Sequence, residues 1–499
     1  MNWHGGCHHD SINAMIDAQA ALIDRIRARC GAKAVIDEPS AIAPWLVDWR
    51  GRYYGRAAAI LTPATTAQVA EMVTLAQAAG VALVPQGGNT SMVGGATPPA
   101  DGSALILSTR RLNRLRSLDP GANLAVAEAG VILADLHAAA EAAGRRFPLT
   151  LGARGSATVG GLVSTNAGGT QVLRFGTMRA LVSGIEAVLP DGSVHDGLAA
   201  LKKDNRGYDL KELLVGAEGT LGIVTAATLR LVPAVAARAV AWCALESPAA
   251  ALALLRRLEA AGEAVESFEI VPQVSLDLVL RHIPGTRAPL TRPHPWHVLI
   301  EATAPAVDPR PAVRPAALLE QQLSAALGDG LVGDAVIAAS EAQAEALWRL
   351  RDSISAAEKA HGPAVQHDVS VPVAAMPRFM VEAAAACEAR FPGTSASGFG
   401  HLGDGNVHFH VRAPAGVDGE DWYAHAAPQI TPFVNDLVVA AGGSISAEHG
   451  IGQMKLGELE RLSSPARLAM LRAIKGALDP HGLMNPGKLV PLAPRAAAP

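Results

Sequence analysis

The chain has few cysteines and few aromatic residues, and it shows no basic excess. Four of its 499 residues are cysteines, and they lie far apart: Cys7, Cys30, Cys243 and Cys387. This spacing argues against a disulfide framework or a C-x-x-C site, so we expect free thiols in a reducing cytoplasm. Because the net charge is −4, we expect no nucleic-acid partner.

Long apolar runs are also missing, although 49% of the residues are hydrophobic. No stretch reaches the roughly 18 uninterrupted apolar residues of a membrane-spanning helix, so no transmembrane segment is expected. Residues 1–10 lack a basic region followed by an apolar core, so they do not resemble a secretory signal. The prediction is therefore a cytoplasmic globular protein with about two to four domains.

The densest group of chemically active side chains lies between residues 398 and 410, where three histidines and an aspartate stand among glycines. After Gly405, polar and apolar residues alternate, which is typical of a strand with one buried face. His401 precedes a tight Gly-Asp-Gly turn, so we expect it to return toward the polar face of that strand. That face carries Asn406, His408 and His410.

A second polar motif, Ser-Ala-Glu-His-Gly at residues 446–450, contains Glu448 and His449. Two imidazoles and one carboxylate form a ligand set of catalytic metal sites, and this set leaves positions open for water or substrate. A hydrogen-bonded polar strand face is the alternative interpretation. A G-x-G-x-x-G pattern also begins at Gly398, but a strand-like run follows it rather than a helix. We therefore reject a dinucleotide fingerprint.

Three glycine-rich segments point to a ligand that lies against the backbone. They span residues 85–95, 152–169 and 215–225, and strand-like segments separate them. Successive backbone N–H groups in such loops form nests for anions such as pyrophosphate. An ordinary surface turn is the alternative for any one loop, and the first loop lacks the lysine of a P-loop. Three together favour an extended, ADP-bearing cofactor.

Hydrophobic periodicity predicts a mixture of helices and strands. Residues 347–355 are expected to be helical, with Leu347, Leu350 and Ile354 buried and with Arg351 and Ser355 on one face. Other helices are expected over 11–31, 65–80, 248–261, 315–327 and 465–478, and strands over 57–61, 81–84, 181–189 and 297–302.

Six motifs resemble a known flavoprotein family and occur in its order between about residues 57 and 490. P-x-G-G-N-T-S, G-G-x-x-x-T-N-A-G-G and E-G-T-L-G-I-V-T resemble the FAD-binding half of the vanillyl-alcohol oxidase/p-cresol methylhydroxylase superfamily. H-L-G-D-G-N-x-H, S-A-E-H-G and N-P-G-K resemble its D-2-hydroxyacid dehydrogenase branch. This branch includes enzymes for D-2-hydroxyglutarate, D-lactate and glycolate.

The resemblance implies an α+β fold with a two-subdomain FAD-binding part and an α+β substrate domain, or cap. The FAD-binding domain would occupy residues 1–233, with its core at 57–233. The cap would occupy residues 234–430. Residues 431–499 would pack back on the flavin.

The resemblance also implies which residues line the FAD. Some members attach flavin through a histidine in the first loop, whereas this sequence has Asn89 there, so non-covalent FAD is expected. The implied set is Pro85, Gly87, Gly88, Asn89, Thr90, Ser91, Gly160, Gly161, Ser164, Thr165, Asn166, Gly168, Gly169, Glu218, Gly219, Leu221, Gly222, Ile223 and Asn485.

The substrate-binding positions depart from those of the similar hydroxyglutarate enzymes. Those enzymes use an arginine, a threonine and a lysine, where this chain has Arg351, Ser355 and Gln366. The asparagine two positions after the second metal histidine is His410 here. The loss of a cation where a distal carboxylate would lie argues for another substrate, such as D-lactate, D-malate or glycolate, or for weaker binding of hydroxyglutarate.

The chemistry that we predict is oxidation of a D-2-hydroxyacid by hydride transfer to flavin, with a metal on the hydroxyl group. His401, His408 and Glu448 are assigned as metal ligands, with zinc as the leading metal and manganese, cobalt or iron(II) as alternatives. His449 is assigned as the general base. His410 would lie behind the ligands, contact the substrate or act as a fourth ligand, and Asp404 would be a turn residue or a hydrogen-bond partner of the site.

Other functions remain open from the sequence. Two histidines and a carboxylate also suit a mononuclear iron oxygenase, and a non-catalytic flavin-binding subunit of a larger complex is a second alternative. The expected electron acceptor is an electron-transfer flavoprotein, a quinone or a cytochrome rather than oxygen. A homodimer is also expected.

Overall fold

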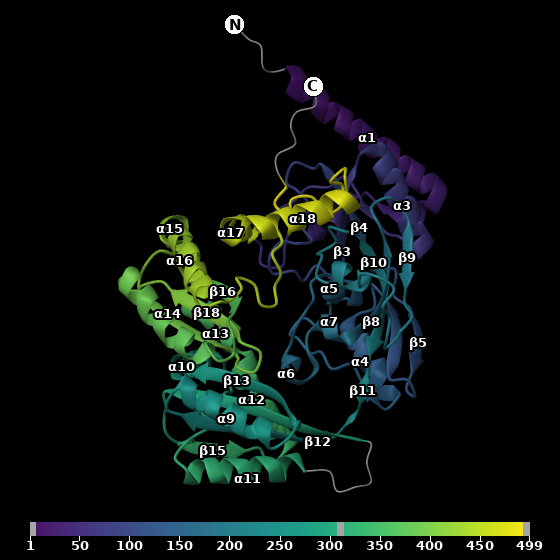
Figure 1. The fold of residues 1–499 in the computed structure, drawn as a ribbon. Coiled ribbons are helices and arrows are strands. Elements are labelled where there is room, and N and C mark those ends of the chain that lie inside the picture. The colour runs from purple at the N-terminus through teal and green to yellow at the C-terminus, as the bar shows by residue number, and fades with distance from the viewer. Residues whose placement is uncertain (1–5, 307–313, 493–499) are drawn as a thin grey trace.

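The computed structural model describes residues 6–306 and 314–492, which form two large parts and a C-terminal segment that runs between them (Figure 1). No helix in these ranges is long and apolar enough to cross a membrane. Cys30, Cys243 and Cys387 are free thiols, which confirms that prediction for these three. Cys7 lies outside the residues whose side chains are described.

A four-stranded sheet and two long helices open the chain. The strand order is β1–β2–β4–β3, in which β2, β4 and β3 are parallel and β1 is antiparallel to β2. Thr65 caps α3 by accepting the N–H of Gln68, and Gly80 ends the helix with a left-handed φ of 65°, as predicted. The helix predicted over 11–31 begins earlier, at Gly6, and ends at Cys30. The elements are α1 (Gly6–Cys30), η1 (Ala32–Ala34), β1 (Val35–Ile36), α2 (Pro39–Ile42), η2 (Ala43–Trp45), β2 (Ile60–Leu61), α3 (Thr66–Ala79), β3 (Ala82–Gln86) and β4 (Ala104–Ser108).

A five-stranded antiparallel sheet follows, in the order β5–β6–β10–β8–β9. Short helices pack against it around a core that includes Phe147, Leu181 and Leu229. The elements are β5 (Leu115–Asp119), β6 (Leu124–Glu128), α4 (Leu133–Ala142), β7 (Arg145–Arg146), α5 (Val159–Ser164), α6 (Val172–Phe175), α7 (Met178–Leu181), β8 (Val182–Val188), β9 (Val194–Gly197), α8 (Leu210–Leu214), β10 (Ile223–Arg230) and β11 (Val232–Pro233).

The second part is built on a seven-stranded antiparallel sheet, in the order β15–β12–β14–β13–β17–β18–β16. We call this part the cap. Its strands are β12 (Val235–Leu245), β13 (Val265–Pro272), β14 (Trp296–Pro305), β15 (Asp334–Ile337), β16 (Ala364–Ser370), β17 (Ser395–His401) and β18 (Asn406–Arg412).

Helices cover both faces of the cap sheet. Leu254 of α9 and Met380 of α14 belong to the core on one face, whereas Leu276 of α10 and Leu347 of α12 belong to the core on the other. The cap helices are α9 (Pro248–Ala260), α10 (Gln273–His282), α11 (Pro315–Gly328), α12 (Glu341–Asp352), α13 (Ile354–His361), α14 (Met376–Arg390), α15 (Gly419–His425) and α16 (Ala427–Ala440).

The predicted strand after Gly405 is present as β18, and it forms a hairpin with β17. Val407 and Phe409 enter one core, as the alternation predicted. His408 lies on the opposite face, beside Phe399 of β17, with ring centroids 5.1 Å apart. This hairpin places His408 and His410 on the face that carries Phe399, opposite Val407 and Phe409.

The C-terminal segment carries α17 (Leu456–Leu462) and α18 (Pro465–Leu478) and crosses from the cap to the N-terminal part, where Figure 1 shows it in yellow. Lys475 donates to the carbonyl oxygens of Thr220 and Met484 at 2.7 and 2.8 Å. The backbone N–H of Asn485 donates to the carbonyl oxygen of Leu83 at 2.8 Å. The segment is thereby attached to β3 and to the third glycine-rich loop.

The helix predicted over residues 347–355 is divided, which corrects one expectation. Ser353 has φ −83° and ψ −4°, and its N–H is shared between the carbonyl oxygens of Arg349 and Arg351. This tightened turn ends α12, and α13 begins at Ile354. Arg351 and Ser355 are therefore not i,i+4 neighbours on one helix.

Candidate active site

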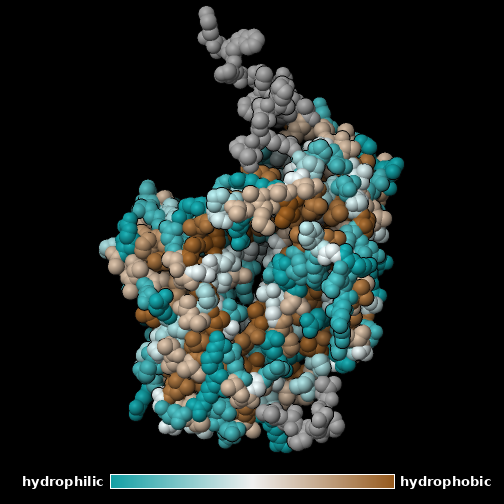
Figure 2. Space-filling view, in the orientation of Figure 1, coloured by the Kyte–Doolittle hydropathy of each residue, from teal (hydrophilic) through white to brown (hydrophobic). Residues whose placement is uncertain are grey.

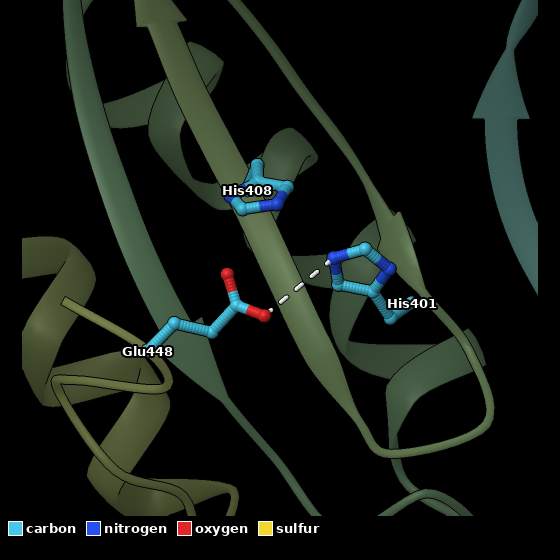
Figure 3. A group of neighbouring side chains, drawn as sticks. All are labelled: His401, His408 and Glu448. Atoms are coloured by element: carbon cyan, nitrogen blue, oxygen red, sulfur yellow. Dashed lines mark ion pairs between the residues drawn. The ribbon is translucent and has the colours of Figure 1, made fainter. Parts of the chain in front are cut away.

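Three predicted metal ligands meet at one point. The side chains of His401, His408 and Glu448 each offer one ligand atom, and these atoms lie within 4.8 Å of one another. His401 comes from the end of β17, His408 from β18, and Glu448 from the loop after α16 (Figure 3). We call this group the metal cluster, because two imidazoles and a carboxylate suit a divalent cation.

The carboxylate of Glu448 shows that the cluster fits a cation. Its Oε1 atom is buried, makes no hydrogen bond in the described part of the chain and lies 3.8 Å from Nε2 of His401. Burial raises the pKa of Glu448 to about 7; Asp368 and Asp404 add to this, and His401 opposes it. A buried carboxylate oxygen that lacks a partner is costly, and a bound cation would supply that partner.

A buried glutamate holds His401 in place. Nδ1 of His401 lies 2.7 Å from Oε1 of Glu269 on β13, which leaves Nε2 directed at the cluster. The other carboxylate oxygen accepts a hydrogen bond from Nε of Arg351 at 2.7 Å. Burial alone would lower the pKa of His401, but Glu269 outweighs it and raises the pKa to about 9. A carboxylate behind a metal-binding histidine orients the ring and increases its basicity.

Asp368 of β16 positions the loop that carries Glu448 and His449. Its Oδ2 accepts the backbone N–H groups of these two residues at 3.0 and 2.9 Å, and it lies 3.4 Å from Nδ1 of His449. Its Oδ1 accepts a hydrogen bond from Asn406 at 2.9 Å. Burial lowers the pKa of His449, and Asp368 opposes that shift only in part. His449 is therefore neutral at neutral pH and can accept a proton.

The three glycine-rich segments line one cavity of ≈ 1160 Å³. Figure 2 shows the surface hollowed between the two parts of the molecule, below the C-terminal helices. At the cavity wall the first two loops touch. A Cβ atom on Gly88 would lie 1.9 Å from the carbonyl oxygen of Ser156, so only glycine allows this approach. The volume exceeds the roughly 300–1,000 Å³ of most small-molecule pockets, so a dinucleotide cofactor and a substrate both fit.

Most of the predicted cofactor residues line this cavity. Of the implied set, four lie outside the lining, and the structure gives them other contacts: Asn166, Gly169, Leu221 and Asn485. Asn166 accepts the N–H of Arg179 at 2.9 Å, and Leu221 is buried in the core of the five-stranded sheet. A Cβ on Gly169 would lie 2.3 Å from the carbonyl oxygen of Thr150.

Glu218 and Asn485 join the loops around the cavity. The carboxylate of Glu218 accepts the backbone N–H groups of Ile451 and Gly452 at 2.7 and 2.8 Å. The amide of Asn485 donates to the carbonyl oxygens of Gly95 and Glu218 at 3.0 and 2.7 Å. Glu218 and Asn485 also have positive φ angles of 51° and 45°, which are uncommon outside glycine. These contacts connect the first and third glycine-rich loops directly to the segment that carries Glu448.

The predicted substrate residues divide into two groups. Ser355 and Gln366 line the cavity, together with Glu448 and His449. Arg351 does not line it, because its guanidinium is engaged with Glu269 and lies 3.5 Å from Nε2 of His401.

His410 also lies away from the cavity. Its Nδ1 is 3.6 Å from Glu358, which forms a buried ion pair with Arg412. His410 is outside the metal cluster, and the ring of Phe399 packs against both His408 and His410. Asp404 accepts the N–H of Asn406 at 3.0 Å and so acts as a turn residue.

Comparison with known proteins decides the family. Residues 57–197 match the model of the FAD binding domain, and residues 235–489 match that of the C-terminal domain of FAD linked oxidases. The chain belongs to the FAD-linked oxidase family. It is an FAD-linked oxidoreductase, and its cofactor is FAD.

Curated relatives of this FAD-linked oxidase extend over most of the chain. It is 38% identical over 455 residues to the D-2-hydroxyglutarate dehydrogenase of Xanthomonas citri pv. viticola, which covers 91% of this chain and 93% of the relative. It is 36% identical over 463 residues to the mitochondrial D-2-hydroxyglutarate dehydrogenase of Arabidopsis thaliana, covering 92% and 80%. It is 32% identical to the D-2-hydroxyglutarate–pyruvate transhydrogenase of Saccharomyces cerevisiae, covering 91% and 90%.

Solved structures confirm the predicted fold. A p-cresol methylhydroxylase with substrate bound matches with a TM-score of 0.72 at 15% identity, and the match covers 95% of this chain and 96% of the other. An alkyldihydroxyacetonephosphate synthase matches with a TM-score of 0.68 at 16% identity, covering 94% and 84%. At these identities the likeness concerns the fold alone.

Sequence reasoning missed three residues of the oxidase site. Glu269 and Asp368 support the metal cluster and its neighbour His449, and Arg50 lines the cavity. The one signal for Glu269 was an acidic residue in an apolar strand, between Phe268 and Ile270. The sequence carried no comparable signal for Asp368 or Arg50.

Proposed function

We propose that this FAD-linked oxidase converts a D-2-hydroxyacid to the 2-oxoacid, with a divalent cation bound by His401, His408 and Glu448. The observation that supports this most directly is the position of the metal cluster, which adjoins the cavity formed by the cofactor loops. Glu448 belongs to the cluster and also lines that cavity. The names of the relatives, which are D-2-hydroxyglutarate dehydrogenases from plant, animal and bacterium, support the same reaction.

The chain's own residues would bind the acid and remove one proton. His449 is neutral because burial lowers its pKa, so it can accept the hydroxyl proton of the substrate. Asp368 would stabilise the imidazolium that forms, because its carboxylate lies 3.4 Å from Nδ1. Glu269 would keep Nε2 of His401 directed at the cluster.

Two bound groups complete the chemistry. A divalent cation supplies Lewis-acid polarisation of the hydroxyl group; for bound water the same effect lowers the pKa from about 15.7 to about 7. FAD supplies the acceptor for the C2 hydride. Attachment of FAD is proposed to be non-covalent, because the first loop carries Asn89, whose amide donates to the carbonyl oxygen of Val47 at 3.0 Å. We propose zinc as the metal, and manganese, cobalt and iron(II) suit the same ligands.

Dye reduction by the purified, flavin-loaded protein tests this function. D- and L-2-hydroxyacids are compared before and after metal removal, and the metal content is measured at each stage. We expect the D-acids alone to reduce the dye, the rate to fall at least about tenfold without metal, and added zinc to restore it. Equal rates for the two enantiomers, or full activity in protein shown to be metal-free, would contradict the proposal.

The acceptor and the assembly are further parts of the proposal. Electrons would leave the flavin for an electron-transfer flavoprotein, a quinone or a cytochrome rather than for oxygen. Comparing turnover with dye to turnover with dissolved oxygen checks this, and hydrogen peroxide formed at the dye-supported rate would contradict it. The proposed homodimer is checked by light scattering on the flavin-loaded protein, where a monomer mass would contradict it.

A further inference from the structure

Arg50 is held in the wall of the cavity by a turn that Asp48 organises. The buried carboxylate of Asp48 accepts the backbone N–H groups of Arg50, Arg52 and Tyr53 at 3.0, 2.6 and 2.6 Å. The half-buried guanidinium of Arg50 lines the cavity, and its Nη1 donates to Oε1 of Gln366 at 3.1 Å. The two residues are 316 positions apart, so this contact joins the N-terminal part to β16 of the cap.

The positive charge of Arg50 is not paired within residues 6–306 and 314–492. No carboxylate in these residues forms a salt bridge with Arg50. Both carboxylate oxygens of Asp48 accept backbone N–H groups instead. Burial lowers the pKa of Arg50 to about 10, with Arg52 adding to the effect and with Asp48 and Asp368 opposing it. A cation withdrawn from water without a counter-ion is costly, and an anionic ligand offsets that cost.

Gln366 sets the distance between this cation and the reacting end of the site. Gln366 and Asp368 are two residues apart on β16, so their side chains share a face and lie about 7 Å apart along the strand. Asp368 of β16 is the pairing partner of His408 of β18, so it lies beside the metal cluster. Because Arg50 occupies the amide oxygen of Gln366, the amide NH₂ group remains as a second donor beside the guanidinium. The two side chains therefore present only donors, one of them charged, at the length of a short carbon chain from the cluster.

We propose that Arg50 and Gln366 bind the distal anionic group of a 2-hydroxyacid whose hydroxyl end lies at the metal cluster. This inference rests on the proposed function and specifies its substrate class: a 2-hydroxyacid with a second carboxylate or a phosphate several bonds from C2. A planar guanidinium can bind two oxygens of such a group at once. The positive charge at this site is that of Arg50, from the N-terminal part of the chain. Gln366 on β16 is neutral and supplies a hydrogen bond only.

The variant Arg50→Gln tests this, because it removes the charge and keeps a hydrogen-bonding side chain. Its kcat/KM is measured by dye reduction with D-2-hydroxyglutarate and with D-lactate, which has no distal carboxylate. We expect a loss of about 100-fold for D-2-hydroxyglutarate and a change below about threefold for D-lactate. Arg50→Lys should recover part of the loss, since lysine keeps the charge without the planar fork.

Arg56→Gln is the matched control. Arg56 lies six positions away, its side chain is exposed, and it is outside the lining of the cavity. Because charges at exposed positions are screened by salt, we expect kcat/KM for either substrate to change by less than about threefold. An equal loss in this control would indicate a general charge effect and overturn the proposal. An equal loss for both substrates in Arg50→Gln would overturn it as well.

Equilibrium binding gives a readout that does not depend on turnover. Glutarate and butyrate are titrated into the flavin-loaded protein while the flavin absorbance is followed. The wild type should bind glutarate more tightly, and Arg50→Gln should abolish the difference. Equal affinities in the wild type would overturn the inference.

Substrate comparison separates the remaining outcomes. A higher kcat/KM for 3-phospho-D-glycerate than for D-2-hydroxyglutarate would support the anion site and assign it to phosphate, and the reverse order would assign it to carboxylate. Equal kcat/KM for D-lactate and both anionic substrates would refute the inference alone. Absence of oxidation with every 2-hydroxyacid would refute the proposed function itself.

Discussion

The affinity of the metal cluster for a divalent cation should rise steeply with pH. A cation binds the deprotonated forms of its ligands. In the metal-free protein the pKa of His401 is about 9, because Glu269 outweighs the opposing effect of burial. The pKa of Glu448 is about 7, chiefly through burial. Metal binding therefore displaces two protons below about pH 7, one between about pH 7 and 9, and neither above that range.

Each displaced proton changes the association constant about tenfold per pH unit. The affinity should thus rise about 100-fold between pH 7 and 9, and more steeply below pH 7. Both groups have pKa values above those of the unfolded chain. Their protonation therefore stabilises the metal-free protein at low pH, and this contribution is lost as the pH rises through about 7 for Glu448 and about 9 for His401.

Competition with a chromophoric chelator at several pH values measures the constant in flavin-loaded protein. Glu269→Gln should flatten the curve between pH 7 and 9, because it removes the charge that raises the pKa of His401. At high pH this variant should bind metal about 10- to 100-fold more weakly. Glu246→Gln, at an exposed glutamate, is the charge-matched control. A wild-type affinity that does not vary between pH 7 and 9 would refute this reasoning.

Two further variants distinguish the proposed metal ligand His408 from the proposed general base His449. His408→Ala should retain FAD, measured by the ratio of flavin to protein absorbance, and should lose turnover by about 1000-fold or more because one of three ligands is gone; near-normal turnover would remove His408 from the site. His449→Gln should retain both metal and FAD and lower kcat by about 100- to 10,000-fold through loss of the proton acceptor. Its metal content is measured directly, and an unchanged kcat would exclude His449 as the base.

The hairpin of the metal cluster could be predicted because its signals are local. Alternation of Val407 and Phe409 with His408 determines which face of β18 is polar, and glycines around Asp404 set the turn that returns His401. The three glycine-rich segments that line the cavity were predictable as a group for the same reason, since each is contiguous in the sequence.

The contacts behind the cluster could not be predicted because their partners are distant in sequence. Glu269 and His401 are 132 positions apart, and Asp368 and Glu448 are 80. The sequences of β13 and β17 do not indicate that these strands are neighbours in the sheet. The buried carboxylate of Glu269 could therefore not be assigned to His401 from the sequence. The division at Ser353 was missed because the apolar periodicity of Leu347, Leu350 and Ile354 continues across it.

Glu218 would couple the binding of FAD to the binding of a divalent cation at the metal cluster. Glu218 lies in the third glycine-rich loop, which lines the cavity. Its carboxylate accepts the backbone N–H groups of Ile451 and Gly452, a few residues beyond Glu448. A ligand that orders one loop lowers the cost of ordering the other, and such coupling is reciprocal by thermodynamic necessity. The factor by which the cation increases the affinity for FAD should equal the factor by which FAD increases the affinity for the cation. Measuring the dissociation constant of FAD with and without a chelator checks this. An unchanged constant would contradict the coupling. With the coupling present, FAD and a cation at the metal cluster would bind cooperatively, and loss of either one would favour loss of the other.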